Sequence, residues 1–286
     1  MKIAIALFGI PRGAEVTMPV IAENIIGPCR DSGQTRIFFH LYKQDRVTNA
    51  RSGDNAVIPP AAYAPFERFE GELEPPDICL GRWHFDVVRG FGDHYRDDFQ
   101  SIRNLLHQLH SLRRVTRAVN AWRPDVVVFI RPDLLYHQRL SAAAIASAGR
   151  DELYCRIPDW QWWGGYNDRF AVCGARAASA YGRRAEVAIE FSLRTGRALH
   201  AERLLRYALR RERAAVRLTG MRASRVRMNG RVVDEDFSWS RTVGSVQRAF
   251  ELNWLRARTE YLGEADTAAD GPGGTSPAAF RIDVTP

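Results

Sequence analysis

The residues best suited to chemistry follow the most apolar segment of the chain. Asp125–Ile130 reads DVVVFI, and Arg131-Pro132-Asp133 comes directly after it. Because side chains two apart in an extended chain point to the same side, we expect Arg131 and Asp133 to lie together. A carboxylate can hold a divalent cation that bridges phosphate oxygens, and a guanidinium can neutralise such oxygens directly. The spacing indicates a diphosphate site; the alternative is an ion pair or cap at a strand end.

A second candidate group is an aromatic loop. The sequence DWQWWGGY, residues 159–166, holds three Trp and one Tyr beside two glycines. Aromatic faces stack on the apolar faces of sugar rings, and glycine lets a ligand approach the backbone. This pattern predicts sugar contacts by Trp162, Trp163 and Tyr166. The alternative is that the tryptophans pack in the core under a long loop.

Polar residues that could act on an acceptor follow this loop. Asp168 could orient or deprotonate a hydroxyl group, since a carboxylate general base needs only a suitably placed acceptor and a modestly raised pKa. Asn167 and Asp168 could instead form a turn that caps the next element. Glu202, near the start of a predicted helix, is either a second acceptor-site carboxylate or a complement to the helix dipole, and we favour the dipole.

Several common catalytic signatures are missing from the sequence. It has no Walker A sequence, no GxGxxG and no GxSxG. Their absence argues against phosphate-loop kinases, dinucleotide dehydrogenases with the usual fingerprint and typical serine hydrolases. His107 and His110 lie three apart on a predicted helix, but no third ligand stands at helical spacing beside them. A half-exposed helix face is therefore favoured over a metal site formed by this pair.

Apolar runs and helical spacing predict the elements that must position these residues. Short apolar runs bounded by Gly or Pro predict strands at 2–8, 35–42, 125–130, 153–157 and 170–173, with shorter ones at 66–69 and 225–228. Helices are expected at 17–26, 97–122, 141–148, 176–195 and 201–216, and the segment 43–81 is expected to be mostly irregular. This alternation predicts an α/β fold with a mostly parallel sheet flanked by helices. Ligands of such sheets bind beyond the carboxyl ends of the strands, which points to Gly9–Gly13 and Arg131–Asp133.

Length and composition set the broad class. The chain has 286 residues, 45% of them hydrophobic and 26% charged, which excludes a disordered chain, a collagen and a coiled coil. No apolar run approaches the roughly 18 residues of a membrane span, and the N-terminus lacks a signal peptide pattern, so we expect a cytoplasmic protein. The four Cys are too far apart in sequence for a zinc or disulfide pattern.

The charge distribution suggests an anionic partner. The formal net charge is +8, and the segment Arg197–Arg231 alone holds eleven Arg against two Glu, a balance of +9. Such a face suits a diphosphate substrate, an anionic membrane surface or nucleic acid. Nucleic acid is disfavoured, because only Tyr207 interleaves the arginines and no recognition module is visible. The alternative is a solvated helix face whose Arg stems cover apolar surface.

Four blocks of the sequence carry a family resemblance. They are KIAIALFGIPRG, IFFHLY, the long block FQSIRNLLHQLHSLRRVTRAVNAWRPDVVVFIRPDLLY, and GGYNDRFAVCGARAASAY. In order and spacing, over roughly residues 1–215, the chain resembles bacterial and phage glycosyltransferases of the GT-A fold that build surface polysaccharide. The Arg-Pro-Asp block is the most specific part. It departs from the family's usual Asp-x-Asp, since Arg131 stands at the first acidic position.

The resemblance implies an organisation and a set of roles. Residues 1–262 would form one GT-A-like domain, with a nucleotide-sugar-binding half at 1–136 and an acceptor half at 137–262, followed by a disordered tail at 263–286. Asp133 would bind Mn²⁺ or Mg²⁺ at the diphosphate, and Asp168 would be the candidate base. The donor would contact Phe8, Gly9, Arg12 and Arg131, and the acceptor Trp162, Trp163, Tyr166, Asn167 and Glu202.

The expected function is sugar transfer from a nucleotide-diphosphate sugar to a hydroxyl group of a saccharide or lipid-linked acceptor. The basic stretch is compatible with docking on an anionic inner membrane surface. Two alternatives stay open. One is a non-catalytic basic protein that binds nucleic acid or an anionic membrane. The other is a catalytically inactive fold that still binds a nucleotide sugar.

Overall fold

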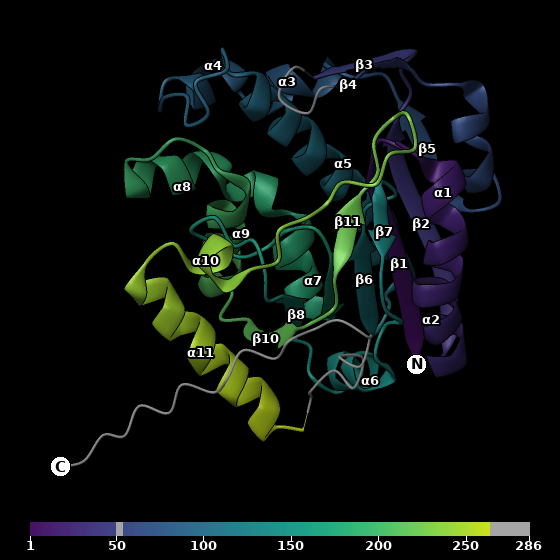
Figure 1. Cartoon of the computed structure of the whole chain (residues 1–286), viewed down its shortest axis with the longest axis vertical. Helices are drawn as coiled ribbons and strands as arrows, with labels where there is room; N and C mark the ends of the chain where they lie inside the picture. Colours follow the sequence, from purple (N-terminus) through teal and green to yellow (C-terminus); the bar gives the residue numbers. More distant parts are fainter. Residues whose placement is uncertain (50–53, 264–286) are drawn as a thin grey trace.

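A seven-stranded, mostly parallel sheet forms the centre of the molecule in the computed structural model, which describes residues 1–49 and 54–263 (Figure 1). The predicted tail lies outside the described residues from position 264 onward. The strand order is β10-β8-β9-β6-β1-β2-β5, and only β9 runs antiparallel to its neighbours. The strands are β1 (Lys2–Gly9), β2 (Gln34–Tyr42), β5 (Glu70–Glu74), β6 (Val126–Ile130), β8 (Tyr154–Pro158), β9 (Ala171–Gly174) and β10 (Ala215–Thr219). The predicted α/β class with a mostly parallel sheet is confirmed.

The two central strands are apolar throughout because both faces of the sheet are covered. Residues 3–8 of β1 and all of β6 are buried. The two strands pair in parallel, with Ile3 opposite Val126 and Leu7 opposite Ile130. Continuous apolar runs of this kind are typical of strands buried on both faces.

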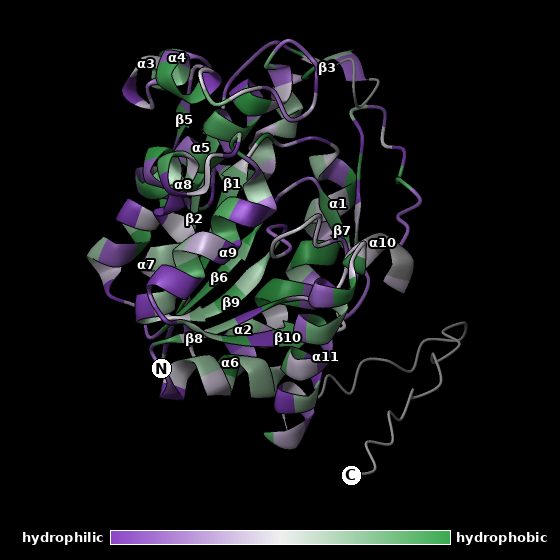
Figure 2. Cartoon of the chain, turned by 90° about the vertical axis from the view of Figure 1, so that its left-hand side faces the viewer, coloured by the Kyte–Doolittle hydropathy of each residue, from purple (hydrophilic) through white to green (hydrophobic). Residues whose placement is uncertain are grey.

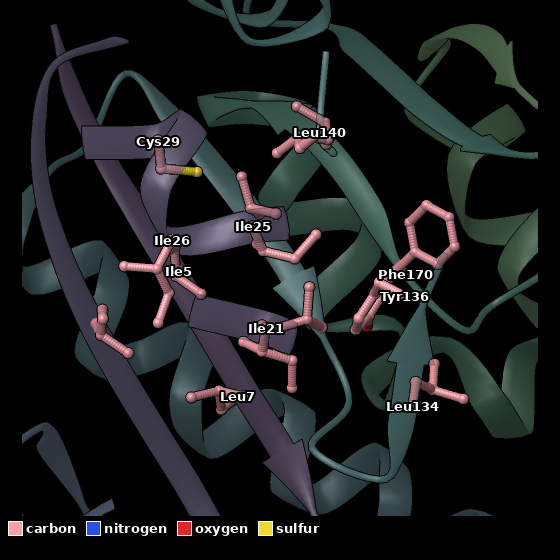
Figure 3. Packing of buried hydrophobic residues seen from close by; sticks show 14 of the residues in the cluster. Ile5, Leu7, Ile21, Ile25, Ile26, Cys29, Leu134, Tyr136, Leu140 and Phe170 are labelled. Atoms are coloured by element: carbon pink, nitrogen blue, oxygen red, sulfur yellow. The ribbon is translucent and has the colours of Figure 1, made fainter. Parts of the chain in front are cut away.

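One face of the sheet is covered by helices near the N-terminus. Ile5 and Leu7 of β1 pack with Ile21, Ile25 and other residues of the segment from α1 to α2 (Figure 3). This segment comprises α1 (Ala14–Ile21), a π-helical stretch (Ala22–Ile26) and α2 (Gly27–Ser32), and α6 (Ala142–Arg150) lies beside it. The predicted helix end near Gly27 is wrong, because proline is tolerated in the first turn of a helix and here Pro28 starts α2.

The opposite face is covered by helices from the middle and the later part of the chain. Ala4, Ala6 and Phe8, the alternate residues of β1, share a core cluster with Leu112 and Val115 of the long helix. These helices are α5 (Gln100–Trp122), α7 (Ala175–Gly182), α9 (Ala201–Arg211), α10 (Trp239–Val243) and α11 (Val246–Tyr261), and α8 (Ala188–Thr195) packs outside them against α9. The helix predicted at 176–195 is divided by a 3₁₀ turn at Arg184–Val187. Figure 2 shows green apolar strands inside a shell of mixed helices.

The segment predicted to be irregular carries short elements that extend the sheet and close over its end. They are β3 (Arg46–Asn49), β4 (Asp54–Val57), 3₁₀ turns at Pro60–Ala62 and Ala64–Phe66, β5, α3 (Ile78–Arg82) and α4 (Phe85–Arg89). A separate two-stranded ribbon joins β7 (Leu134–Tyr136) to β11 (Ala223–Arg225), so the chain after β6 is tied to a segment about ninety residues later. Among the described residues, no helix is both long and apolar enough to cross a membrane.

Candidate functional site

The candidate site lies at the carboxyl ends of β1 and β6, which are neighbours in the sheet. Gly9 ends β1 with φ of 110°, a conformation that favours glycine. A Cβ atom built at Gly9 would meet no atom within 4 Å outside its chain neighbours, so the backbone there faces open space. Arg131 and Asp133 follow β6. The structure thus brings together the two segments that the sequence singles out.

Arg131 and Asp133 form a two-pronged ion pair. Arg131 Nε donates to Asp133 Oδ1 at 2.9 Å, and Nη2 donates to Oδ2 at 2.7 Å. Burial by itself would raise the pKa of Asp133, but the charges of Arg131 and then Arg12 outweigh it and lower this pKa to about 2. Asp133 is therefore a carboxylate at any physiological pH. The predicted placement of these two side chains on one side of the chain is confirmed.

More arginines gather around this pair. Arg12 Nη2 lies 3.4 Å from Asp133 Oδ2, and Arg12 Nη1 donates to Asp54 Oδ2 at 2.8 Å. Arg227 Nη1 lies 3.5 Å from the same oxygen of Asp54. Both Arg12 and Arg227 have a buried Nε without a hydrogen-bond partner in the part of the chain that the structure describes. Unsatisfied guanidinium donors favour an anionic ligand.

The whole group carries excess positive charge. Arg169 contributes too, since its charge helps to lower the pKa of Asp133. Burial, and then the charge of Arg225, lower the pKa of Arg169 itself to about 10. We call Arg12, Arg131, Arg169 and Arg227 the arginine cluster. Three of the four form ion pairs with two acids, Asp54 and Asp133, so the cluster has an excess of two positive charges. The neighbouring pairs Arg184–Asp168 and Arg225–Glu235 each add no net charge.

The residues at Asp133 do not fit the expected Mn²⁺ or Mg²⁺ ion. Both carboxylate oxygens already accept hydrogen bonds from Arg131. A hard divalent cation needs several oxygen ligands. The nearest charged neighbours of Asp133, Arg131 and Arg12, are instead cations, which would repel it. The local charge suits the phosphate groups of a ligand directly.

Asp168 is connected to this group through one glutamine. Gln108 Nε2 donates to Asp168 Oδ2 at 2.7 Å, while Arg131 Nη1 donates to Gln108 Oε1 at 3.4 Å. The buried Arg184 donates to the same Asp168 oxygen at 3.1 Å, and Tyr181 OH donates to the Asp168 backbone carbonyl at 2.8 Å. Two side-chain donors, Gln108 of α5 and Arg184 of the 3₁₀ turn after α7, therefore hold the carboxylate, and Tyr181 holds its backbone beside the arginine cluster.

Two of the predicted acceptor residues belong to the core. Trp162 is 1% exposed, and its Nε1 donates to the Pro158 carbonyl at 2.9 Å. Tyr166 is 4% exposed and donates to Glu251 Oε1 at 3.0 Å. Neither ring presents a free face, so stacking of Trp162 and Tyr166 on a sugar does not fit this structure. The core reading of these two aromatics is the better one.

Other predicted residues divide into exposed and structural positions. Trp163 is exposed and remains available for contact with a ligand. Asn167 is buried in a turn, with Nδ2 donating to the Trp160 carbonyl and Oδ1 accepting from Arg169 N. Glu202 Oε2 lies 3.1 Å from His200 Nδ1 at the start of α9, as expected of a residue near a helix N-terminus.

Phe8 also lies in the core, 0% exposed, where it packs with α5 rather than lining a ligand site. Sequence reasoning did not single out Gln108, Arg169, Arg184 or Arg227. The block around Asn167 and Asp168 contained a signal for Arg169. The other three come from distant segments that only the fold brings together.

A separate polar group lies under Gly9. Gly9 N donates to Ser111 Oγ at 2.9 Å, and Ser111 contacts His40. His40, Glu74 and His110 offer ligand atoms within 4.8 Å of one another, so this group could hold a metal ion. Sequence spacing pairs His110 with His107 and predicts a half-exposed helix face, but His110 is 2% exposed and its partners come from β2 and β5, which no local spacing contains.

Hydrogen bonds define the protons of this group. Trp83 Nε1 donates to His110 Nδ1 at 3.0 Å, so the neutral His110 ring carries its proton on Nε2, 3.0 Å from Glu74 Oε1. Ser111 Oγ donates to the His40 carbonyl at 2.7 Å and therefore accepts from His40 Nδ1. His40 Nε2 then presents a lone pair to Glu74 Oε2 at 3.3 Å, which requires a proton or a cation between them. At His110 the bond from Trp83 favours a proton over a metal ion.

The buried His110 predicts a pH-dependent stability. Burial lowers the pKa of His110 to about 4, against about 6.5 in an unfolded chain. Between these values the unfolded chain binds a proton that the folded chain does not, so the free energy of unfolding rises with pH there, by on the order of 3 kcal/mol in total. Urea unfolding in EDTA at pH 4–7 should show this rise, and His110→Gln should flatten it. The exposed His84→Gln is the control that keeps it; an unchanged slope in His110→Gln would contradict the assignment.

Comparisons with known proteins add little beyond the fold. No protein-family model matches the chain, and no curated protein matches its sequence. One solved structure to which it is similar is mouse xyloside xylosyltransferase 1 in its apo form, with a TM-score of 0.39 and 8% identity, over 76% of this chain and 85% of that one. A likeness at this level carries no argument about activity.

Proposed function

We propose that the protein is a glycosyltransferase with a GT-A-like fold, which moves a sugar from a nucleotide-diphosphate sugar to a hydroxyl group. The observation that carries this proposal is the arginine cluster at the carboxyl ends of β1 and β6. Ligands of open α/β sheets bind at this edge. A diphosphate supplies the anionic oxygens that the partnerless donors of Arg12 and Arg227 call for.

The arginine cluster would act mainly on the leaving group. When the bond between the sugar and the diphosphate breaks, negative charge develops on the departing phosphate oxygen. Guanidinium groups held in place beforehand stabilise this charge without reorganising, and the site is largely shielded from water: the side chains of Arg12 and Arg131 are 14% and 17% exposed. Asp133 would orient Arg131 through its two hydrogen bonds. In this scheme Asp133 is a positioning residue and holds no metal.

Asp168 would serve the acceptor side of the reaction. Gln108 bridges Asp168 and Arg131 through one hydrogen bond to each. A sugar donor bound at Arg131 and an acceptor bound at Asp168 would therefore meet between these two residues. We propose that Asp168 orients or deprotonates the acceptor hydroxyl, with Trp163 as the exposed aromatic contact. This assigns donor binding mainly to residues 1–136 and acceptor binding mainly to residues 137–262.

Metal independence is a direct prediction of this site. Turnover measured with excess EDTA should stay within about twofold of turnover with added Mn²⁺ or Mg²⁺, because arginines take the place of the cation. The measurement is release of the nucleoside diphosphate from the sugar donor. A loss of more than tenfold in EDTA, restored by Mn²⁺, would contradict the arrangement described at Asp133.

The test of the proposed function itself is a thermal shift with nucleoside diphosphates and nucleotide sugars. A ligand that binds only the folded chain raises its midpoint of unfolding in proportion to affinity. We expect one nucleotide class to raise the midpoint by several degrees, and Arg131→Gln to abolish the shift. No shift with any nucleotide, in a folded sample, would reject the donor site. A shift without turnover on a panel of saccharide and lipid-linked acceptors would leave a nucleotide-sugar-binding protein that is catalytically inactive.

A further inference from the structure

The outer face of α11 is a continuous apolar stripe. Val246, Phe250, Trp254 and Tyr261 are 87%, 76%, 53% and 89% exposed. Steps of four, four and seven residues place these side chains on one side of a helix. Leu262, just beyond the helix, is also exposed. Large apolar side chains are rarely left in water as a contiguous set on a monomer, so this stripe calls for a partner.

The other face of α11 already packs on the protein. Leu252, Leu255 and Thr259 are buried, and the helix lies against β10 on the outside of the molecule (Figure 1). A helix that is apolar on two opposite faces is normally covered on both. The stripe is therefore a second apolar surface of α11, directed away from the sheet.

Arginines lie beside the middle of the stripe, at Trp254. Together α9 and α11 carry eight Arg against four Glu, counted over residues 201–213 and 246–261. Arg210, Arg211 and Arg213, at the end of α9, are exposed. Arg258 lies over the Trp254 ring, 5.3 Å from its centroid.

A hollow between the two helices is lined by arginines and by an edge of the stripe. Arg210 and Arg258 border it, together with Tyr166, Glu251 and Trp254. Aromatic and aliphatic side chains next to arginines with long apolar stems are the composition of helices that lie in a membrane interface. The positive charge complements an anionic headgroup layer.

We propose that α11 docks the protein on an anionic lipid surface. Val246, Phe250, Trp254 and Tyr261 enter the boundary between headgroups and acyl chains, and the arginines of α9 and α11 contact lipid phosphates. The helix lies parallel to the surface and does not span the bilayer. Stable docking needs both apolar insertion and attraction between arginines and anionic headgroups. A short apolar stripe alone binds a membrane weakly, and so do a few arginines alone.

The position of α11 connects this surface with the acceptor side of the proposed enzyme. Arg248, near the start of α11, borders Gly164 of the aromatic loop, and Glu251 accepts a hydrogen bond from Tyr166. A docked molecule would hold this loop and the exposed Trp163 close to the lipid. This consequence rests on the proposed function and favours a lipid-linked acceptor. The docking itself does not depend on it.

Sedimentation with vesicles tests the docking without any activity measurement. The probes are vesicles of phosphatidylcholine alone and vesicles with one quarter phosphatidylglycerol, at low salt. We expect binding to the anionic vesicles only, and a loss of about tenfold or more in the double variant Phe250→Ser/Trp254→Ser. Arg258→Gln, at a residue that borders the hollow and lies over the Trp254 ring, should weaken binding about fivefold. Leu193→Ser, which removes an equally exposed side chain on α8, is the matched control and should bind as the parent does.

A second readout locates the contact. Lipids brominated on their acyl chains should quench part of the tryptophan emission, and Trp254→Phe should lose that part while still sedimenting with the vesicles.

Two results of the sedimentation experiment would overturn the proposal. One is that the parent protein fails to bind anionic vesicles, and the other is that the double serine variant binds them equally well. Analytical ultracentrifugation measures the oligomeric state and so tests a second copy of the chain as the partner of the stripe. If the parent protein is a dimer and the double serine variant is a monomer, the stripe is a dimer interface instead. Nucleotide binding is measured separately by thermal shift. A failure to bind vesicles therefore does not reject the proposed donor site, and a failure to bind nucleotides does not reject the docking.

Discussion

Replacing Arg131 with glutamine is expected to lower kcat/KM for the nucleotide-sugar donor by about 10²–10³-fold. This is the range found when one donor that stabilises developing negative charge is removed. Arg131 is held by two parallel hydrogen bonds to a carboxylate, so its position is well defined. Glutamine keeps much of the length of the side chain but removes its charge.

The same change should also destabilise the fold. Asp133 is 4% exposed, and without Arg131 its charge is left with Arg12 at 3.4 Å as the nearest partner. Breaking a buried ion pair on one side costs about 3–5 kcal/mol, which Arg12 should reduce. Urea unfolding measures this loss, and activity is then compared at a temperature where each variant is folded. Arg131→Lys should recover part of the activity, because it restores the charge but not the two-pronged geometry.

Arg36→Gln is the matched control for this experiment. Arg36 also forms an ion pair with a carboxylate, Glu70, but at the far edge of the sheet between β2 and β5, where it is 41% exposed. The control should change neither kcat/KM nor stability by more than a small factor. Near-normal turnover in a folded Arg131→Gln protein would remove the arginine cluster from the reaction.

The second large effect is expected for Asp168→Asn, which should lower kcat by about 10²–10⁴-fold while leaving donor affinity within a few-fold. The amide keeps the shape of the side chain and can still accept from Gln108, but it cannot take a proton or carry charge. The separation of kcat from donor affinity is what distinguishes an acceptor-side role from a donor-side role. Initial rates at saturating acceptor, together with donor binding by calorimetry, measure the two quantities.

A purely structural role of Asp168 must be separated from this outcome. Arg184 is 1% exposed and loses its charged partner in the variant, so some stability is lost in either case. Asp159→Asn provides a comparison, because Asp159 also pairs with arginines, Arg222 and Arg256, at the start of the aromatic loop. If both variants lose turnover only in proportion to their unfolded fraction, Asp168 has no catalytic part.

The sequence predicted the centre of the fold well, because buried parallel strands are continuous apolar runs. This is why β1 and β6, and the turns that follow them, are found where they were expected. It failed at the edges of the sheet. The edge strand β5 reads EGELE, and its glutamates pair with Arg36 and Arg114 rather than with a core.

The other edge of the sheet was missed for a different reason. Helical spacing predicts one helix over 201–216, which includes the first residues of β10. In the structure α9 ends at Arg211, and the chain turns at Arg213 with φ of 58°. Local periodicity continues across such a turn, because Val216 and Leu218 are apolar in either structure. Only the pairing of β10 with β8 decides between them.

At the site, the sequence predicted the local pair and missed its surroundings. Arg131 and Asp133 are two residues apart, so their contact follows from strand geometry. Arg227 reaches Asp54 from more than 170 positions away, which no local pattern contains. Composition also could not separate the tryptophans: Trp162 and Trp163 are adjacent and equally aromatic, yet one is in the core and the other is exposed.

The order of the strands has a consequence for folding during synthesis. The four neighbouring strands β5, β2, β1 and β6 all come from residues 2–130, so this parallel half of the sheet can pair before the rest of the chain exists. Arg12, Asp54, Arg131 and Asp133 belong to this early half, whereas Arg227 is added 91 residues after Tyr136. At ordinary translation rates that interval lasts roughly 5–20 s. The nascent chain would thus hold its two carboxylates beside Arg12 and Arg131 first; Arg169 would add the first excess positive charge, and Arg227 would complete the cationic excess that suits a diphosphate only in the last third of synthesis.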